Sequence, residues 1–377
     1  MRVLQFGRYW NENFGGLERH VQLLSKGLAA QGVDVVNLVA ASGINGSDEI
    51  LDGYRLVRVP SFGTVFSTAM APALVLKALT LHREKPFDII HLHFPDPLSH
   101  GASLFLPASI KRVITWHSDI VRQKRLLALY RPLLQRFTRR ADALVAATQM
   151  HYESSTQIPA DIPATRRHVI PYGLNYSSLA LTPSLIALRD AIKSKANGRP
   201  VIFALGRHVY YKGFDVLIEA MRHVDAYLVL GGDGPLRSQL QAQAVQIGVS
   251  HKVWFVGRIL EAELPAYFHA CDVFCFPSVE QSEAFGLVQL EAMACGKPVV
   301  CSQLNNGVNV VNLHQETGLA VPVRDPVALG GALMQLLRDD GLRSRLGEQA
   351  IVRAYSLYSL SAMTASHVRL YKSLFTR

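Results

Sequence analysis

The sequence lacks the features of a membrane-spanning or disulfide-stabilised secreted protein. No apolar run approaches the roughly 18 residues of a membrane span. The first residues, MRVLQF, have no charged region, long apolar core or cleavage site of a signal peptide. Only four cysteines occur, without the paired spacing of metal ligands. We therefore expect a cytoplasmic protein with reduced cysteines, either soluble or peripheral on the inner face of the cell membrane.

Two common nucleotide-binding signatures are also absent. The chain has neither the G-x-G-x-x-G fingerprint of dinucleotide-binding enzymes nor the G-x-x-x-x-G-K-[ST] loop of nucleoside triphosphatases. A nicotinamide enzyme is therefore disfavoured. There is no pattern of stacking aromatic residues and no known nucleic-acid module, so a nucleic-acid partner is not expected.

The length and composition of the chain favour a globular protein of two domains. The chain has 377 residues, of which 49% are hydrophobic and 18% charged, and one hydrophobic core rarely extends past about 250–300 residues. The net charge is +10, and residues 1–183 carry 20 Lys+Arg against 13 Asp+Glu, which is +7 of that total. The basic first half indicates either an anionic partner or a merely soluble basic surface.

Predicted strands and helices alternate in both halves, which is typical of α/β proteins with parallel strands. We predict two doubly wound, Rossmann-like domains, at residues 1–183 and 184–354. Between them, 184–199 is polar and ends in the turn signal NGRP. Residues 355–377 are predicted to be helical, and they can pack back on the first domain. Ligands of such sheets bind at the carboxyl ends of the strands.

Two positions at strand ends of the first half are candidate site residues. Gly16 lies where the first strand gives way to a helix, so that the helix N-terminus can approach an anion; a plain tight turn is the alternative. His117, in TWHSD, ends another strand, but a lone histidine is more often structural. His91 and His93 alternate on one strand face. A metal site would need a third ligand and carboxylates nearby, and the sequence offers no convincing set.

The second half offers two further groups at strand ends. Arg207 and Lys212 follow the strand VIFALG, and two cations in such a loop suit a diphosphate, although a solvated basic loop is the alternative. In SEAFGLVQLEAMACGKPVV, a helix is expected to begin near Phe285-Gly286. The N–H groups of Phe285, Gly286 and Leu287 suit a phosphate.

Two glutamates flank this helix start. Glu283 precedes it, and Glu291 lies eight residues later, just over two helical turns. The two carboxylates can therefore contact the two ends of one extended ligand, and carboxylates accept hydrogen bonds from sugar hydroxyls. Two ordinary surface glutamates are the alternative for this stretch taken alone.

Together these motifs resemble the retaining, nucleotide-sugar-dependent glycosyltransferases of family 4, whose GT-B fold has two Rossmann-like domains facing across a cleft. The resemblance covers nearly the whole chain, and SEAFGLVQLEAMACGKPVV matches the specific E-x7-E motif of the family. It also covers the stretches FGGLERHVQLLSKGLAAQG, TWHSDIV, ALGRHVYYKGFDVLIEAM and GGDGP.

The resemblance implies a role for each matched residue. Arg207 and Lys212 hold the donor diphosphate, Glu283 lies by the donor sugar, and Glu291 binds the ribose. The backbone of Phe285, Gly286 and Leu287 forms the donor-binding turn. The family also implies roles at three other positions: Gly16 near the diphosphate and acceptor, His117 near the sugar, and Arg258 where the base docks.

The chemistry implied is transfer with retention and without a metal ion. The chain has no D-x-D motif, and cations with helix N–H groups can stabilise the leaving nucleoside diphosphate. We therefore expect no cofactor and no metal. The two-carboxylate displacement of glycosidases is not transferred here, since the family mechanism is drawn as same-face attack.

The resemblance is to bacterial mannosyl- and rhamnosyltransferases of O-antigen or exopolysaccharide assembly, which favours GDP-mannose as donor; a UDP-sugar is the alternative. Residues 303–311, QLNNGVNVV, replace an expected Gly/Ser-rich turn near the sugar, so the hexose is open. The acceptor implied is a polyprenyl-diphosphate-linked saccharide, with a soluble one as the alternative. The basic stretch 121–143 predicts an amphipathic helix that contacts an anionic membrane, or one whose leucines face the core.

Two other function classes remain as alternatives. One is another enzyme of the same fold, such as a sugar-nucleotide epimerase or a sucrose- or trehalose-type synthase. An epimerase should lack the E-x7-E arrangement, and a synthase has no need of a basic first domain. The other is a non-catalytic protein that binds a nucleotide sugar or lipid phosphate, against which the intact set Arg207, Lys212, Glu283 and Glu291 argues.

Overall fold

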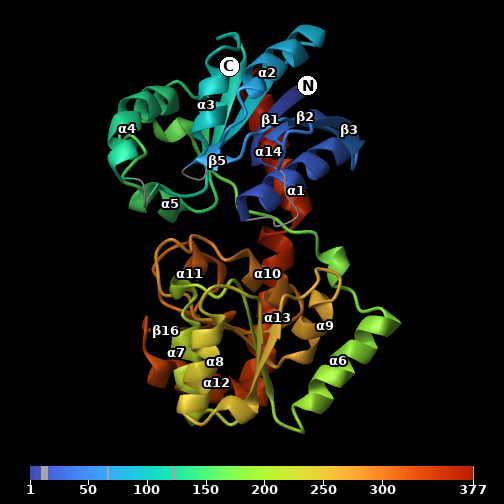
Figure 1. Cartoon of the computed structure of the whole chain (residues 1–377), viewed down its shortest axis with the longest axis vertical. Helices are drawn as coiled ribbons and strands as arrows, with labels where there is room; N and C mark the ends of the chain where they lie inside the picture. Colours follow the sequence, from blue (N-terminus) through green and yellow to red (C-terminus); the bar gives the residue numbers. More distant parts are fainter. Residues whose placement is uncertain (10–15, 66–67, 121–123, 377) are drawn as a thin grey trace. The chain divides into compact units, whose positions relative to one another are not determined.

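The computed structural model describes residues 1–9, 16–65, 68–120 and 124–376 (Figure 1). The chain divides into two compact units. Unit 1 comprises residues 1–173 and 360–377, and unit 2 comprises residues 174–359. The predicted boundary after Pro183 therefore falls inside unit 2, because the segment just before it packs with the second domain.

Unit 1 is built on an eight-stranded sheet in the order β10-β9-β8-β7-β1-β2-β4-β3, in which all neighbours are parallel except the pair β3 and β4. The strands are β1 (Arg2–Tyr9), β2 (Asp34–Ala40), β3 (Ser47–Leu51), β4 (Tyr54–Val59), β7 (Ile89–Phe94), β8 (Lys111–Trp116), β9 (Ala143–Ala146) and β10 (Arg167–Val169). The short strands β5 (Thr64–Val65) and β6 (Thr68–Ala69) pair in an antiparallel, two-stranded sheet. The strand β1 lies between β2 and β7, so the strand order of the sheet reverses at β1.

Both faces of this sheet are covered. Along β1, Leu4 and Phe6 belong to one core, whereas Val3 belongs to the core on the other face, as the twofold alternation of a strand requires. The helices of unit 1 are α1 (Gly16–Ala30), α2 (Ala73–Glu84), α3 (Pro97–Ser103), α4 (Lys124–Arg139), α5 (Gln149–Ser154) and α14 (Leu360–Ser373).

The helix α14 completes unit 1 although it follows unit 2 in the sequence. It packs against α1 (Figure 1), and its residues Met363, Leu370 and Tyr371 are buried in the same core as Val3. The contact with α1 is close at Gly27, where a Cβ would lie 2.2 Å from Thr364 Cγ2. A small residue in α1 therefore sets how near the two helices approach.

Unit 2 has a six-stranded, wholly parallel sheet in the order β13-β12-β11-β14-β15-β16. The strands are β11 (Val201–Leu205), β12 (Tyr227–Gly231), β13 (Val253–Gly257), β14 (Val273–Phe276), β15 (Val299–Ser302) and β16 (Gly318–Val321). The strand order reverses between β11 and β14. In open parallel sheets, such a switch point is where ligands bind.

Helices cover this second sheet as well. They are α6 (Pro183–Lys195), α7 (Phe214–Ala220), α8 (Arg237–Gln246), α9 (Leu264–Ala270), α10 (Leu287–Ala294), α11 (Gly307–Val311), α12 (Pro326–Arg338) and α13 (Asp340–Leu357). The helix α6 occupies most of the stretch interpreted as a polar connection. Its start is capped by Thr182, whose side chain accepts a hydrogen bond from the Leu185 N–H, and it packs on α9.

Candidate active site

The loops that follow β11 and β14 bring Lys212 and Glu283 together at the switch point of unit 2. Lys212 Nζ forms an ion pair with Glu283 Oε2, and each side chain is only 13% exposed. The Ser278 hydroxyl donates a second hydrogen bond to the same carboxylate oxygen, at 3.1 Å. A cation and a carboxylate 71 positions apart are therefore held in direct contact.

The position of Lys212 is fixed by its surroundings. Its ammonium lies 5.0 Å from the centre of the Phe276 ring and 5.6 Å from that of Tyr211, within the range of cation–π attraction. Lys212 ends the short 3-10 helix η3 (Tyr210–Lys212). The next residue, Gly213, has a φ of 66°, and a Cβ there would lie 2.0 Å from the Pro277 carbonyl oxygen. Only glycine permits this close approach of the two loops.

The helix α10 begins as predicted near Phe285-Gly286. Gly286 is its N-cap with a φ of 74°, and a Cβ at this position would lie 2.7 Å from two carbons of the Phe276 ring. Glycine is therefore needed both for backbone conformation and for space. The N–H groups of a first helical turn have no carbonyl partner within the helix and favour an anion.

Asn306 connects the Glu283 loop to the next loop of unit 2. Its side-chain amide donates to the Glu283 carbonyl oxygen at 2.9 Å, and its oxygen accepts from the Val308 N–H at the start of α11. Its neighbour Asn305 is exposed, with a φ of 52°. The two asparagines thus differ: Asn306 holds the backbone around Glu283, and Asn305 presents its side chain to solvent.

Glu291 lies within α10 and is only 6% exposed. Burial, followed by the nearby Glu291 carboxylate, raises the pKa of the Tyr176 phenol. Glu283 lies in the loop before the helix, so the two glutamates occupy different elements.

Arg207 and Arg258 are both exposed and follow the ends of β11 and β13. Arg207, Arg258 and Glu283 therefore lie in loops that follow the carboxyl ends of strands β11, β13 and β14 of one sheet.

In unit 1, His117 follows β8 and is buried. Its Nδ1 lies 2.6 Å from the Tyr172 hydroxyl and its Nε2 lies 3.0 Å from His93 Nδ1. Burial lowers the pKa of His117 well below its usual value, and the neighbouring His93 lowers it further, so the ring is neutral. Gly16 is the first residue of α1 and is exposed; residues 10–15 lie outside the described part of the chain.

The structure adds one residue that the sequence interpretation missed. His20, in the second turn of α1, lies beside His93 and His117, with ring centres 5.6 and 5.1 Å away. The available signal was its place in ERHVQLL, where it precedes Val21 and Leu24 on the buried side of the helix. It supplies the third histidine that was not found from the sequence.

The basic stretch 121–143 forms α4 from Lys124 onward, whereas residues 121–123 lie outside the described part. The leucines of α4 divide between a buried and an exposed environment. Leu134 is fully buried in the core, but Leu126, Leu129 and Leu133 are 43%, 81% and 44% exposed. Among the described residues, no helix combines the length and apolarity that a membrane span requires.

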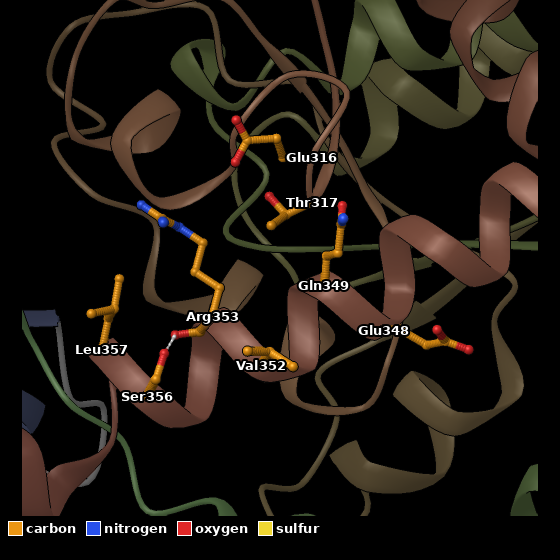
Figure 2. Close-up of a pocket in the computed structure, with 8 residues that line it drawn as sticks. All are labelled: Glu316, Thr317, Glu348, Gln349, Val352, Arg353, Ser356 and Leu357. Carbon is orange, nitrogen blue, oxygen red and sulfur yellow. Dashed lines mark hydrogen bonds between the residues drawn. The ribbon is translucent and has the colours of Figure 1, made fainter.

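One open pocket lies away from all predicted site residues. It has a volume of about 530 Å³ (Figure 2). Its lining comes from α13 and the turn before β16, namely Glu316, Thr317, Glu348, Gln349, Val352, Arg353, Ser356 and Leu357. The Arg353 guanidinium already donates to the carbonyl oxygens of Val310 and Val311. The pocket shares no residue with the Lys212–Glu283 group, and we assign it no role in the candidate site.

Comparison with known families identifies both halves of the chain. Residues 14–178 match the model described as Glycosyltransferase Family 4, and residues 188–353 match that of Glycosyl transferases group 1. A D-rhamnosyltransferase of Pseudomonas aeruginosa, WbpZ, is 32% identical over 95% of this chain and 92% of its own length. The chain belongs to glycosyltransferase family 4.

The glycosyltransferase has a second relative in the O-antigen chain mannosyltransferase C of Escherichia coli, which is 29% identical over 99% of both chains. Among solved structures, a sucrose-phosphate synthase of Thermosynechococcus elongatus superposes with a TM-score of 0.81 at 23% identity, covering 100% of this chain and 99% of its own. HepE of Anabaena in complex with UDP superposes with a TM-score of 0.75 at 22% identity, covering 99% and 100%. The predicted GT-B fold of two Rossmann-like domains is thereby confirmed.

Proposed function

We propose that the glycosyltransferase transfers mannose from GDP-mannose, with retention of configuration, to a saccharide acceptor linked to polyprenyl diphosphate, in the synthesis of a cell-surface polysaccharide. Two observations support this proposal: the relatives named above, one of them an O-antigen chain mannosyltransferase, and the Lys212–Glu283 pair at the switch point of unit 2. His117 and Gly16 keep the roles that the family resemblance implies.

The proposed chemistry uses Lys212 and Arg207 to stabilise the leaving diphosphate. Without a donor, the Lys212 charge is balanced by Glu283. A bound diphosphate offers stronger acceptors, so Lys212 turns to the phosphate oxygens and Glu283 is released to accept hydrogen bonds from sugar hydroxyls. The first-turn N–H groups of α10 add to the stabilisation. Glu291 is proposed to bind the ribose, and Arg258 is proposed to lie where the base docks.

Metal independence of the transfer is part of the proposal. Positive charge at the diphosphate comes from side chains and helix N–H groups, which take the role that Mg²⁺ has in other transferases. Turnover should therefore persist in excess EDTA. Abolition by EDTA with recovery on addition of Mg²⁺ or Mn²⁺ would show that a diphosphate-bound ion is required.

Titration calorimetry of the full chain without added metal tests the donor. GDP and GDP-mannose should bind more tightly than UDP, and a Glu283→Ala variant should still bind GDP while losing turnover. A preference for UDP would overturn the GDP assignment. That second candidate has one specific observation in its favour, because HepE, similar in fold, has been solved with UDP and with UDP-glucose.

The acceptor assignment predicts contact with an anionic membrane through α4. The helix exposes Leu126, Leu129 and Leu133, and Arg125, Arg131 and Arg136 lie on the same helix. Each cation near an anionic surface contributes about 1 kcal/mol. Vesicles containing phosphatidylglycerol should sediment the full chain, and Leu129→Glu should weaken sedimentation. Equal sedimentation with neutral vesicles, or none at all, would remove the membrane from the proposal.

A further inference from the structure

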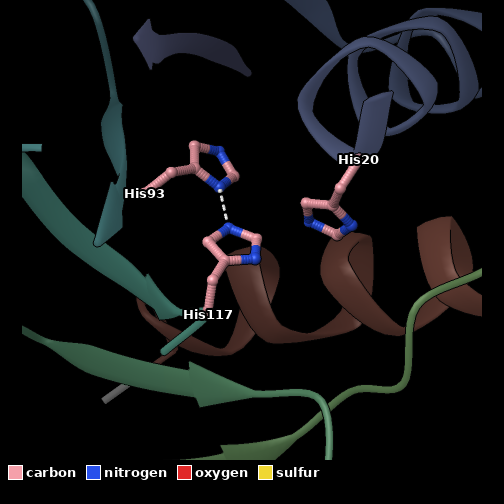
Figure 3. A group of neighbouring side chains, drawn as sticks. All are labelled: His20, His93 and His117. Carbon is pink, nitrogen blue, oxygen red and sulfur yellow. Dashed lines mark hydrogen bonds between the residues drawn. The ribbon is translucent and has the colours of Figure 1, made fainter. Parts of the chain in front are cut away.

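Three buried histidines of unit 1 converge from three different elements. His20 comes from α1, His93 from β7 and His117 from the residue after β8 (Figure 3). They are 3%, 0% and 8% exposed. One ring nitrogen of each lies within 4.8 Å of those of the other two. Three buried imidazoles in one place need an explanation, because buried polar atoms normally have hydrogen-bond partners.

The hydrogen bonds of His93 define which of its nitrogens carries a lone pair. His93 Nε2 lies 2.8 Å from Gln5 Oε1. An amide oxygen only accepts, so Nε2 carries the proton and donates to it. The lone pair of the neutral ring is then on Nδ1, which faces His117 Nε2 at 3.0 Å. His93 is thus held by Gln5 with its free electron pair directed into the group.

His117 can direct a lone pair to the same place. Its Nδ1 lies 2.6 Å from the Tyr172 hydroxyl, which either donates or accepts. With the proton on Nε2, His117 donates to His93 Nδ1, which is the hydrogen bond of the metal-free group. With the proton on Nδ1, His117 donates to the Tyr172 oxygen, and Nε2 is unprotonated beside His93 Nδ1, as binding of a metal ion requires. Each ring then has an outer hydrogen bond on its far nitrogen, the arrangement found for histidines that ligate metals.

His20 is the member that hydrogen bonding does not account for. Neither of its ring nitrogens has a hydrogen-bond partner among the residues that the structure describes, although the side chain is almost completely buried. An unpaired buried donor or acceptor costs about 1–3 kcal/mol. A ligand between the three rings would remove this cost.

We propose that His20, His93 and His117 bind one Zn²⁺ ion, with its fourth position open. Three imidazoles without a carboxylate suit Zn²⁺ and not Mg²⁺ or Ca²⁺, which take oxygen ligands. With Zn–N distances of about 2.0–2.1 Å, tetrahedral ligands lie roughly 3.3 Å apart. The His93–His117 separation of 3.0 Å is close to this value, and the His20 nitrogen, which lies within 4.8 Å of the other two, has to approach them by a side-chain movement. The proposal does not rest on the proposed function, and it competes with the sugar role of His117, because a His117 that ligates Zn²⁺ through Nε2 and bonds Tyr172 through Nδ1 has no ring nitrogen left for a sugar hydroxyl.

Binding of Co²⁺, a spectroscopic substitute for Zn²⁺, tests the site. The full chain is first stripped with a chelator and then titrated. We expect one Co²⁺ per chain with the visible absorption of a tetrahedral complex, displaced by one equivalent of Zn²⁺. His20→Gln, which keeps most of the side-chain volume, should abolish this absorption. Gln5→Leu, which removes an outer hydrogen bond, should weaken binding by roughly 10- to 100-fold.

The matched control is His251→Ala, which removes an exposed histidine of unit 2 and should bind Co²⁺ like the unaltered chain. Circular dichroism melting in EDTA verifies that each variant is folded, and Zn²⁺ should raise the melting temperature only where His20 is present. If the unaltered chain gives no tetrahedral absorption, or if His20→Gln binds equally well, the three rings are a packed hydrogen-bonding cluster and the proposal is wrong.

Discussion

Replacement of Gly286 by alanine should destabilise unit 2 substantially. The residue has a φ of 74°, a conformation that costs an L-residue about 1–2 kcal/mol. The added Cβ would also lie 2.7 Å from Cε1 and Cζ of Phe276. Phe276 ends β14 and is almost fully buried, so its ring has little room to move, and overpacking of this kind costs about 1–3 kcal/mol. The two contributions together give a loss of roughly 2–5 kcal/mol.

Urea unfolding of the full chain, followed by circular dichroism, measures this loss. With a slope of about 1–3 kcal/mol per molar urea, the transition of unit 2 should move down by on the order of 1 M. Gly331→Ala is the matched control. Gly331 lies in α12, and a Cβ there meets no atom within 4 Å, so this variant should gain roughly 0.5–1 kcal/mol. Equal midpoints for Gly286→Ala and the unaltered chain would refute the argument that the loop requires glycine.

Three further predictions follow from the described contacts. Lys212→Ala should lower kcat by roughly 10²–10³-fold through lost leaving-group stabilisation, while the exposed control Arg222→Ala retains it; normal kcat in Lys212→Ala would remove the diphosphate role. Gly27→Ala should destabilise unit 1 by about 1–3 kcal/mol, because its Cβ would lie 2.2 Å from Thr364 Cγ2. Adding Thr364→Ser to the Gly27→Ala variant deletes that methyl group and keeps the hydroxyl, so it should restore the urea midpoint. If the double variant stays as unstable as Gly27→Ala, the clash with Thr364 is not the cause. Burial lowers the pKa of His100 to about 3, so the unfolded chain binds a proton that the folded chain does not below pH 6.5. The contribution of His100 to stability is complete above that pH and should fall by roughly 1.4 kcal/mol per pH unit as the pH drops toward 3, in addition to the contributions of the other buried histidines. A His100→Gln variant with the same slope of stability against pH would contradict this assignment.

Much of the fold could be predicted because parallel strands buried on both faces have continuous apolar sequences. VIFALG, VFCFPS and RVITWHS each correspond to a strand of the structure. The strands β3 and β4 are harder to predict, because an edge pair is partly exposed and its sequence, SDEILDGYRLVRV, is charged. Its turn signal was present, since Asp52 and Gly53 both have positive φ, as a tight hairpin requires.

The candidate site of unit 2 was visible because its residues lie in compact motifs. Glu283, Gly286 and Glu291 span nine positions, so one strand–loop–helix segment places them all. The pairing of Glu283 with Lys212 was less accessible, because it depends on β11 and β14 being neighbours in the sheet.

The histidine group of unit 1 is the contrary case. His20, His93 and His117 lie on separate elements, and no spacing rule connects them. They meet because β7 lies between β1 and β8 while α1 packs over the sheet. Such a group follows from topology and not from sequence spacing.

The return of α14 to unit 1 has a consequence for the order in which the chain folds during synthesis. Domains generally fold as units while the ribosome is still adding residues. Unit 2, residues 174–359, is complete before α14 has been made. Unit 1 must wait, with Val3 and Leu24 lacking the cover that Met363 and Tyr371 later provide. The domain whose synthesis begins first is therefore the one that finishes folding last, and during that interval its exposed apolar surface is open to chaperones.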